Sequence, residues 1–177
     1  MLGLAASWMM LDSWRVVEFG GASRIAVLSY SDRTGSEWVP VATVLASRRD
    51  AYCRKHGDTC VHANGRQLPV HPERALEFEK VPAILATLSD PRFDAVLYLD
   101  DDTVLCNDEL MVESFLGSYW QGVILSQHDH PKRLKGKRPW WTGTPNTGVA
   151  IYRSTQWVKR LLNDMLMNWR CQGFWKP

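Results

Sequence analysis

Short apolar runs alternate with polar or amphipathic segments along the chain, and this alternation predicts the fold. Three runs have the length and composition of buried strands, at residues 24–30, 59–63 and 96–99. The segments between them, at residues 40–56 and 82–88, have helical features. Strands that alternate with helices are typical of βαβ units, so we expect one three-layer α/β/α domain with a mostly parallel mixed sheet.

The two predicted helices have recognisable ends. Pro40 suits the first turn of the first helix, and Gly57 stands where a glycine commonly ends one. Pro82 marks the start of the second helix, which leaves Lys80 just before its N-terminus. The expected apolar stripes are Val41, Leu45 and Tyr52 in the first helix and Ala83, Ile84 and Leu88 in the second.

The last third of the chain predicts two more strands and a helix. The strands are expected at residues 122–126 and 147–152, separated by a long irregular segment at 127–145. Loops of that length inside a compact domain are usually functional. Ser154 is expected to cap the final helix, whose apolar residues recur every four positions as Trp157, Leu161, Met165 and Trp169.

Residues 1–23 show no clean periodicity, and we expect a leader that is poorly ordered or peripheral, followed by one domain over residues 24–177. The apolar start, Met1 to Leu11, is too short to span a bilayer. No Lys or Arg precedes it, as a signal peptide would require. The chain itself therefore predicts neither a membrane span nor an address.

Composition excludes several classes of protein. Hydrophobic residues make up 45% and charged residues 23% of the 177 residues, an ordinary globular balance that argues against disorder. The formal net charge of +2 gives no indication of nucleic acid or an anionic membrane as a partner. The four cysteines do not have zinc-finger spacing. Cys53 and Cys60 either close a small loop as a disulfide or remain free buried thiols.

Three consecutive carboxylates, Asp100, Asp101 and Asp102, end the apolar run at 96–99. On a strand, Asp100 and Asp102 would face one way and Asp101 the other. Like charges so close together are costly unless a cation or strong hydrogen bonds compensate them. A hard divalent metal, Mn²⁺ or Mg²⁺, prefers such oxygen ligands and often shares its shell with substrate phosphates, although a solvated acidic turn is the alternative.

The acidic triplet fits two metal chemistries. Asp100 and Asp102 would hold the metal against a nucleotide diphosphate, where it offsets the charge of the departing diphosphate. Alternatively, the same pair matches a phosphatase of the haloacid dehalogenase type, in which the first Asp attacks phosphorus. The position of the triplet speaks against a phosphatase, because such enzymes usually open with these carboxylates, whereas here two strands and two helices precede them.

Two further segments carry candidate binding residues. Asn146, Thr147 and Gly148 offer hydrogen-bonding groups suited to sugar hydroxyls and a close backbone approach, or they form a plain turn. The basic segment 127–141 ends in Trp140 and Trp141, which would stack on a sugar ring if the segment acts as a lid, or pack on the core. His128 and His130 in this segment are further, weaker candidates for metal ligands.

Four segments in order resemble a known family. They are residues 24–30, the end of the first helix with its Tyr-x-x-x-His-Gly pattern at 52–57, the acidic segment 99–107, and residues 146–154. This order resembles the GT-A nucleotide-sugar glycosyltransferases. It resembles most the galactosyl/mannosyl-transferase family that includes fungal Golgi mannan enzymes and plant xyloglucan xylosyltransferases. Lys80 stands where that family commonly has a lysine before a helix.

The resemblance implies a GT-A fold and a metal-dependent, retaining transfer of a sugar from a UDP- or GDP-sugar donor to a glycan acceptor. It implies a location in the Golgi lumen or membrane. The metal would be held by Asp100 and Asp102. The implied nucleotide-binding residues are Ser29, Tyr30, Ser31 and Asp101, and the implied sugar- or acceptor-binding residues are Lys80, Trp141, Asn146, Thr147 and Gly148.

The chain departs from the family pattern at its C-terminal end. Family members continue with a further acidic or Gln element and a metal-binding His, and no equivalent follows the last predicted helix. We therefore expect a domain that is incomplete at its C-terminus. A non-catalytic relative that binds a nucleotide-sugar is a further alternative.

Overall fold

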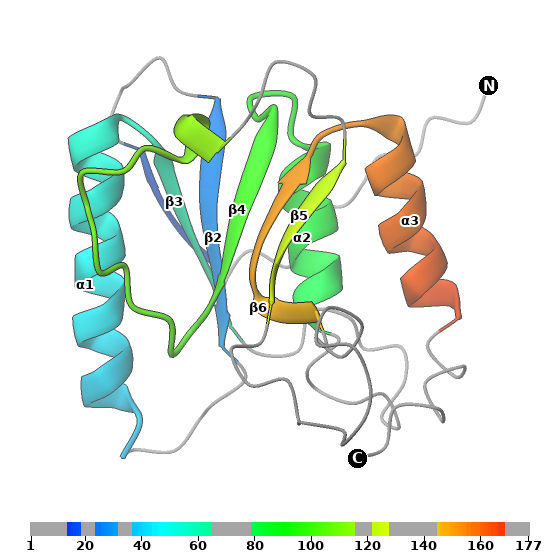
Figure 1. Ribbon diagram of the computed structural model, residues 1–177. Helices are drawn as coiled ribbons and strands as arrows, with labels where there is room; N and C mark the ends of the chain where they lie inside the picture. The colour runs from blue at the N-terminus through cyan, green and yellow to red at the C-terminus, as the bar shows by residue number, and fades with distance from the viewer. Residues whose placement is uncertain are drawn as a thin grey trace, which may run out of the picture.

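The computed structural model describes residues 14–18, 24–31, 37–64, 79–115, 122–127 and 145–168. Six described strands form one sheet in the order β1–β3–β2–β4–β6–β5 (Figure 1). Their bounds are Trp14–Glu18 (β1), Ile25–Ser31 (β2), Thr59–Asn64 (β3), Ala95–Asp100 (β4), Val123–Gln127 (β5) and Pro145–Arg153 (β6). Three α-helices, Val39–His56 (α1), Lys80–Ser89 (α2) and Gln156–Met167 (α3), and a 3₁₀ turn, Val112–Phe115 (η3), complete the described elements.

The sheet is mixed, as expected, but its parallel part is confined to three strands. β2 pairs in parallel with β3 and with β4, whereas the ladders β1–β3, β4–β6 and β5–β6 are antiparallel. A helix lies between β2 and β3 and between β3 and β4, and a helical crossover returns the chain in the same direction. The sequence has no helical pattern between β5 and β6, and those strands run antiparallel.

Helices cover both faces of the sheet, which gives the predicted three layers (Figure 1). One core lies between the sheet and α2 with α3, and includes Leu28, Val96, Ile84 and Leu162. The other lies under α1 and η3 and includes Val27, Leu97, Tyr52 and Val112. Successive residues of β2 and β4 alternate between the two cores, so these strands are buried on both sides and read as continuous apolar runs.

Helix α1 follows the prediction closely, with one correction. It ends at Gly57, whose φ of 75° is left-handed and suits a residue without a β-carbon. Leu45 and Tyr52 are buried as predicted, whereas Val41 is exposed. The buried face instead includes Arg49 and Cys53, at helical spacing from Leu45.

Helix α2 begins at Lys80, so the predicted start at Pro82 was wrong by two residues. Proline at the third position of a helix costs little, because the first four backbone N–H groups have no partner within the helix. Lys80 is therefore the first residue of the helix rather than a residue before it. This places its side chain at the same end of the sheet as Asp100, 3.3 Å away.

Helix α3 corrects two predictions. Its N-cap is Thr155, whose hydroxyl accepts a hydrogen bond from Val158 N at 3.2 Å, whereas Ser154 donates to the carbonyl of Leu88. Val158 and Leu162 form the buried face. The predicted stripe of Trp157, Leu161 and Met165 is exposed, since it lies one residue, or about 100°, around the helix. Trp169 lies outside the described residues.

Part of the expected leader belongs to the sheet. Residues 14–18 form β1 at the edge, antiparallel to β3, with Trp14 opposite Ala63 and Glu18 opposite Thr59. In the described part of the chain, no helix combines the length and apolar character needed to cross a membrane.

Candidate active site

The chain reverses its direction of winding at the boundary between β2 and β4. From β2 it passes through α1 to β3 on one side, and from β3 through α2 to β4 on the other side. The two helices cover opposite faces of the sheet (Figure 1). At such a switch point, the carboxyl ends of the two parallel strands border a crevice that commonly binds ligand. Ser31 ends β2 and Asp100 ends β4, so both lie at this position.

The acidic triplet forms a turn rather than a continued strand. Strand β4 ends at Asp100, and Thr103 N donates to the carbonyl of Asp100 at 3.0 Å. Asp101 is buried and Asp102 is exposed. The prediction that Asp101 faces away from Asp102 therefore agrees with their burial, but a tight turn produces it in place of strand alternation.

Asp101 joins the ends of two elements. Its Oδ2 accepts a hydrogen bond from Ser31 Oγ at 2.5 Å and another from Trp38 Nε1 at 3.0 Å. Ser31 ends β2, and Trp38 is the residue before α1. The carboxylate thus links the turn after β4 to the end of β2. Its predicted contact with the nucleotide-sugar donor stays a prediction.

Two side chains contact one carboxylate oxygen of Asp100. Oδ1 accepts a hydrogen bond from Tyr98 Oη at 2.7 Å and lies 3.3 Å from Lys80 Nζ. Burial, together with the charge of Asp100, raises the pKa of Tyr98 well above its ordinary value. The tyrosine is therefore a neutral donor, and the carboxylate of Asp100 is its acceptor.

Lys80 also connects the turn to the start of β6. Its Nζ lies 3.5 Å from the carbonyl oxygen of Thr147 and 5.3 Å from the centre of the Tyr98 ring. The register of β5 and β6 shifts between Leu125, paired with Ala150, and Ser126, paired with Asn146. Residues 147–149 of β6 lie at this irregularity, a feature that is common beside active sites. The predicted sugar-binding residues Thr147 and Gly148 fall within it.

Arg49, on the buried face of α1, contacts the same turn. The side chain is 3% exposed, and its Nη2 lies 2.8 Å, 2.9 Å and 3.0 Å from the carbonyl oxygens of Asp100, Asp101 and Thr103. Burial lowers the pKa of Arg49, and the negative charge of Asp101 opposes this effect most strongly, with Asp102 and Asp100 contributing less. The guanidinium therefore compensates both the carbonyl dipoles and the carboxylates.

Helix α1 also fixes the segment that follows the turn. Tyr52 Oη donates to the carbonyl of Leu110 at 2.8 Å, and a ring nitrogen of His56 lies 2.7 Å from the carbonyl of Asp108. Lys55 pairs with the carboxylate of Glu109. The Tyr-x-x-x-His-Gly pattern thus has a structural role, because both its aromatic residues bind the backbone beyond the acidic turn.

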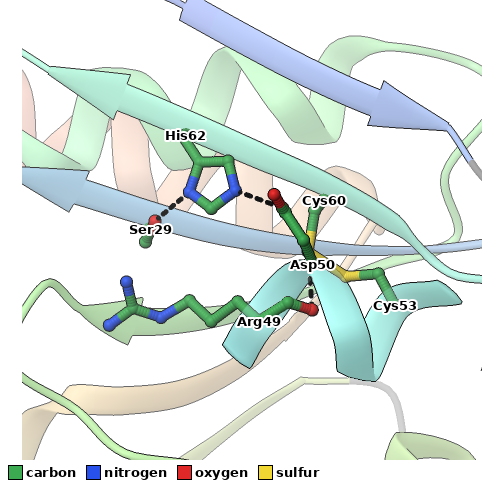
Figure 2. The surroundings of a disulfide bond; sticks show 6 residues. All are labelled: Ser29, Arg49, Asp50, Cys53, Cys60 and His62. Atoms are coloured by element: carbon green, nitrogen blue, oxygen red, sulfur yellow. Dashed lines mark hydrogen bonds and ion pairs between the residues drawn. A yellow bond between two sulfur atoms is a disulfide. The ribbon is translucent and has the colours of Figure 1, made fainter. Parts of the chain in front are cut away.

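A disulfide joins α1 to β3 beside this region (Figure 2). It links Cys53 and Cys60, so the open alternative of free thiols is resolved in favour of the bond. Ligand atoms of Asp50, Cys60 and His62 all lie within 4.8 Å of one another. The sulfur of Cys60 belongs to the disulfide and offers no thiolate, so we do not assign a metal to this cluster.

His62 links two other side chains in the same cluster. Its Nδ1 lies 3.0 Å from Ser29 Oγ, and its Nε2 lies 2.8 Å from Asp50 Oδ1 (Figure 2). Ser29 is therefore directed toward His62, and Tyr30 packs in the core under α2. Of the four predicted nucleotide-binding residues, Asp101 lies in the acidic turn, and the side chain of Ser31 is hydrogen-bonded to it.

Other predicted residues are placed less completely. Asn146 contributes its backbone to β6, where it pairs with Ser126. Trp141, the basic segment around it, and His128 and His130 lie outside the described residues.

Sequence reasoning missed Arg49, Trp38 and the role of Tyr98. A signal for Arg49 was present, since it occupies a position four residues after Leu45 and three before Tyr52, within an apolar stripe. A charged residue at such a position is buried and needs partners. The partners themselves are backbone carbonyls more than 50 positions away, which no local pattern indicates.

Comparison with known proteins decides the family. The model of the galactosyl transferase GMA12/MNN10 family matches residues 21–171, most of the chain. The chain belongs to this family. The resemblance seen in the sequence is therefore confirmed, and the acidic turn, Lys80 and the start of β6 all lie within the matched region.

A solved structure confirms the fold class. The chain is similar to a glycosyltransferase involved in the glycosylation of the major capsid of PBCV-1, with a TM-score of 0.56 and 21% identity. The match covers 84% of this chain and 66% of that protein. At this identity it supports the GT-A-like α/β fold alone. Among curated proteins, none matches the chain significantly.

Proposed function

We propose that this domain transfers a sugar from a nucleotide-diphosphate donor to a glycan acceptor, with a divalent metal held by Asp100 and Asp102. The observation that carries the proposal is the acidic turn at the switch point between β2 and β4. Membership of the galactosyl transferase family supports a sugar transferase in preference to the phosphatase alternative. The retaining outcome, the uracil or guanine base and a Golgi location are part of the same proposal by family resemblance.

The donor set fits Mn²⁺ or Mg²⁺. Asp100 accepts a hydrogen bond from Tyr98, and Asp102 is an exposed carboxylate two residues further along the same turn. These are hard oxygen ligands on a tightly bonded backbone, the type that both metals prefer. When bound, the metal would stabilise negative charge on the diphosphate leaving group.

The chain's own residues supply the other parts of the site. Lys80, 16% exposed and next to Asp100, is a cation at the crevice that favours an anionic phosphate. Ser31 and Asp101 close the end of β2 against the turn, where the nucleoside would lie. The irregular start of β6 at Thr147 and Gly148 offers backbone groups on the sugar side.

The test is calorimetric titration of UDP, and then GDP, with and without Mn²⁺. We expect one of them to bind only with Mn²⁺, and the preferred nucleotide identifies the base. Asp102→Ala should abolish metal-dependent binding while the far-ultraviolet circular dichroism stays unchanged. Asp164→Ala, which removes an exposed carboxylate on α3, is the matched control and should bind as the wild type does.

Three results would oppose the proposal, each in a different way. Unchanged nucleotide affinity in Asp102→Ala would exclude the acidic turn as the metal site. Trapping of a phosphoenzyme on Asp100 with a simple phosphate ester would favour the phosphatase. Metal-dependent binding without donor hydrolysis or transfer would retain the nucleotide site but identify the domain as a non-catalytic relative.

A further inference from the structure

The buried side chain of Arg49 contacts backbone carbonyls of the acidic turn. Its Nη2 lies within 3.0 Å of three carbonyl oxygens, those of Asp100, Asp101 and Thr103. Asp100 is the first of the two proposed metal ligands, and the three residues flank the second, Asp102, in the sequence. One nitrogen with two N–H bonds is thus shared among three acceptors within a single turn.

The disulfide anchors helix α1 one turn after Arg49. Residue 53, one turn later on the same helix, is bonded to β3 through the disulfide. The carbonyl oxygen of Arg49 lies 3.2 Å from Cys60 Sγ, and Figure 2 shows the arginine side chain running from this cluster along the sheet. The helix backbone that carries Arg49 is therefore anchored to the sheet, and the length of the side chain determines how far the guanidinium reaches toward the turn.

We infer that Arg49 is a positioning residue for the metal site: it holds the backbone of residues 100–103 in the turn that presents Asp100 and Asp102 together. The inference rests on the proposed function, since it concerns the metal of that site. It does not make Arg49 a ligand, because a guanidinium has no acceptor atom. Its action is on the backbone that carries the ligands, as outer-shell groups commonly act on metal affinity.

The charge of Arg49 and its positioning role predict opposite changes in Mn²⁺ affinity when the residue is replaced, which makes the inference testable. A buried cation close to the acidic turn repels a divalent metal, so its charge alone would weaken metal binding. Removing Arg49 would then tighten the binding of Mn²⁺. A residue that positions the ligands has the reverse effect, and its removal weakens binding.

The experiment measures the affinity of the full chain for Mn²⁺ alone, from the paramagnetic resonance signal of the free ion. Arg49→Met removes the donors and the charge, and Arg49→Lys keeps the charge on a side chain about one bond shorter. We expect both variants to raise the Kd for Mn²⁺ about tenfold or more. Arg48→Met, a change at an exposed arginine next along the same helix, should leave the Kd within about twofold.

A second measurement separates positioning from a purely structural role. Circular dichroism and urea unfolding establish the folded fraction, and Kd values are compared for folded protein only. Arg49→Lys keeps the aliphatic stem and charge of the original residue, so it provides the test even if Arg49→Met does not fold. We also expect saturating Mn²⁺ to restore nucleotide affinity in the variants to near the wild-type value.

The possible failures are distinguishable. Variants that unfold more easily but bind Mn²⁺ as the wild type does would show a structural role only and overturn the inference. Tighter Mn²⁺ binding by Arg49→Met would show an effect of charge alone and would also overturn it. A wild-type chain that binds Mn²⁺ neither alone nor in the presence of UDP or GDP would instead refute the proposed function and, with it, the inference.

Discussion

Three adjacent carboxylates are stable at this site because each has a different environment. Asp100 is bonded to Tyr98 and Lys80, Asp101 is buried against neutral donors, and Asp102 is exposed. The backbone that joins them accepts hydrogen bonds from a buried guanidinium. The mutual repulsion expected from the sequence is thus reduced by specific hydrogen-bond donors at Asp100 and Asp101.

Removing the hydroxyl of Tyr98 tests whether its hydrogen bond to Asp100 supports metal binding. Tyr98→Phe removes the hydrogen bond to Asp100 Oδ1 and leaves Lys80 as the remaining partner of that oxygen. We expect the free energy of unfolding to fall by about 1 kcal/mol, because one buried hydrogen bond is lost. Mn²⁺ affinity should fall several-fold, because the carboxylate is less well oriented.

Urea unfolding and Mn²⁺ titration check both parts. Tyr152→Phe is the control, since Tyr152 belongs to the same core and does not hydrogen-bond to Asp100 in the described structure. Unchanged Mn²⁺ affinity in Tyr98→Phe would show that Lys80 alone orients Asp100.

At this scale, residue types were predictable and partners were not. The sequence identified the acidic triplet by composition and Lys80 by resemblance, because both belong to short local patterns. It could not identify Arg49 as a partner of the turn, since the contacts run from a side chain to backbone carbonyls 51 to 54 residues away. Carbonyl acceptors are present at every position and leave no trace in a sequence pattern.

Among the elements, α1 does most to position the site. It contacts the segment after β4 through four residues, Arg49, Tyr52, Lys55 and His56. The contacts run from the acidic turn to Leu110, so one helix sets the course of a segment without regular structure. Rigid elements that carry positioning residues make a site more precise than loops alone do.

The disulfide should be a measurable part of this support. Reduction of Cys53–Cys60 with a dithiol opens a loop of eight residues without changing any side-chain volume. Chain entropy predicts a loss of about 2.5 kcal/mol in the free energy of unfolding. Urea unfolding with and without the reductant measures it.

The exposed thiol of Cys106 provides the control for this measurement. Cys106→Ser should unfold at the same urea concentration as the wild type, and it should lose the same stability on reduction. Equal midpoints for the oxidised and reduced wild type would show that the disulfide contributes nothing to stability.

Element types were better predicted than the faces they bury. Helix α1 was expected with its correct end, because the glycine after His56 has a specific conformational use. The stripe of α3 was assigned one residue out, because Trp157 and Leu161 are as apolar as Val158 and Leu162. Periodicity gives the spacing of a buried face, but contact with α2 decides which of two neighbouring stripes is buried.

The whole molecule derives its site from topology. The sequence order of helices and strands predicted the α/β class, and both parallel ladders that flank β2 follow from it. The antiparallel return of β6 beside β4 was not predicted, since strand order at the edge is set by packing of distant segments. That return brings the carbonyl of Thr147 to within 3.5 Å of Lys80 Nζ, beside the acidic turn.

Buried tyrosines on both faces of the sheet predict how the whole fold responds to alkali. Tyr52 belongs to α1 and lies in the core on one face of the sheet, and Tyr152 lies in the core on the other face. Burial is the main cause that raises the pKa of each from 10.0 to about 12, and nearby carboxylates add to it. The folded state therefore holds these phenolic protons more tightly than the unfolded state does.

The sign of the pH effect follows from this difference. A raised pKa contributes stability that is fully present below pH about 10 and is lost as the pH rises toward about 12. For Tyr152 the contribution is on the order of 2 kcal/mol. Urea midpoints across this range should fall with pH, and phenolate absorbance should rise in step with unfolding. Tyr152→Phe should flatten the curve, because its unfolded state has one fewer phenol to ionise. A midpoint that stays constant up to pH about 12 would contradict the burial of both tyrosines.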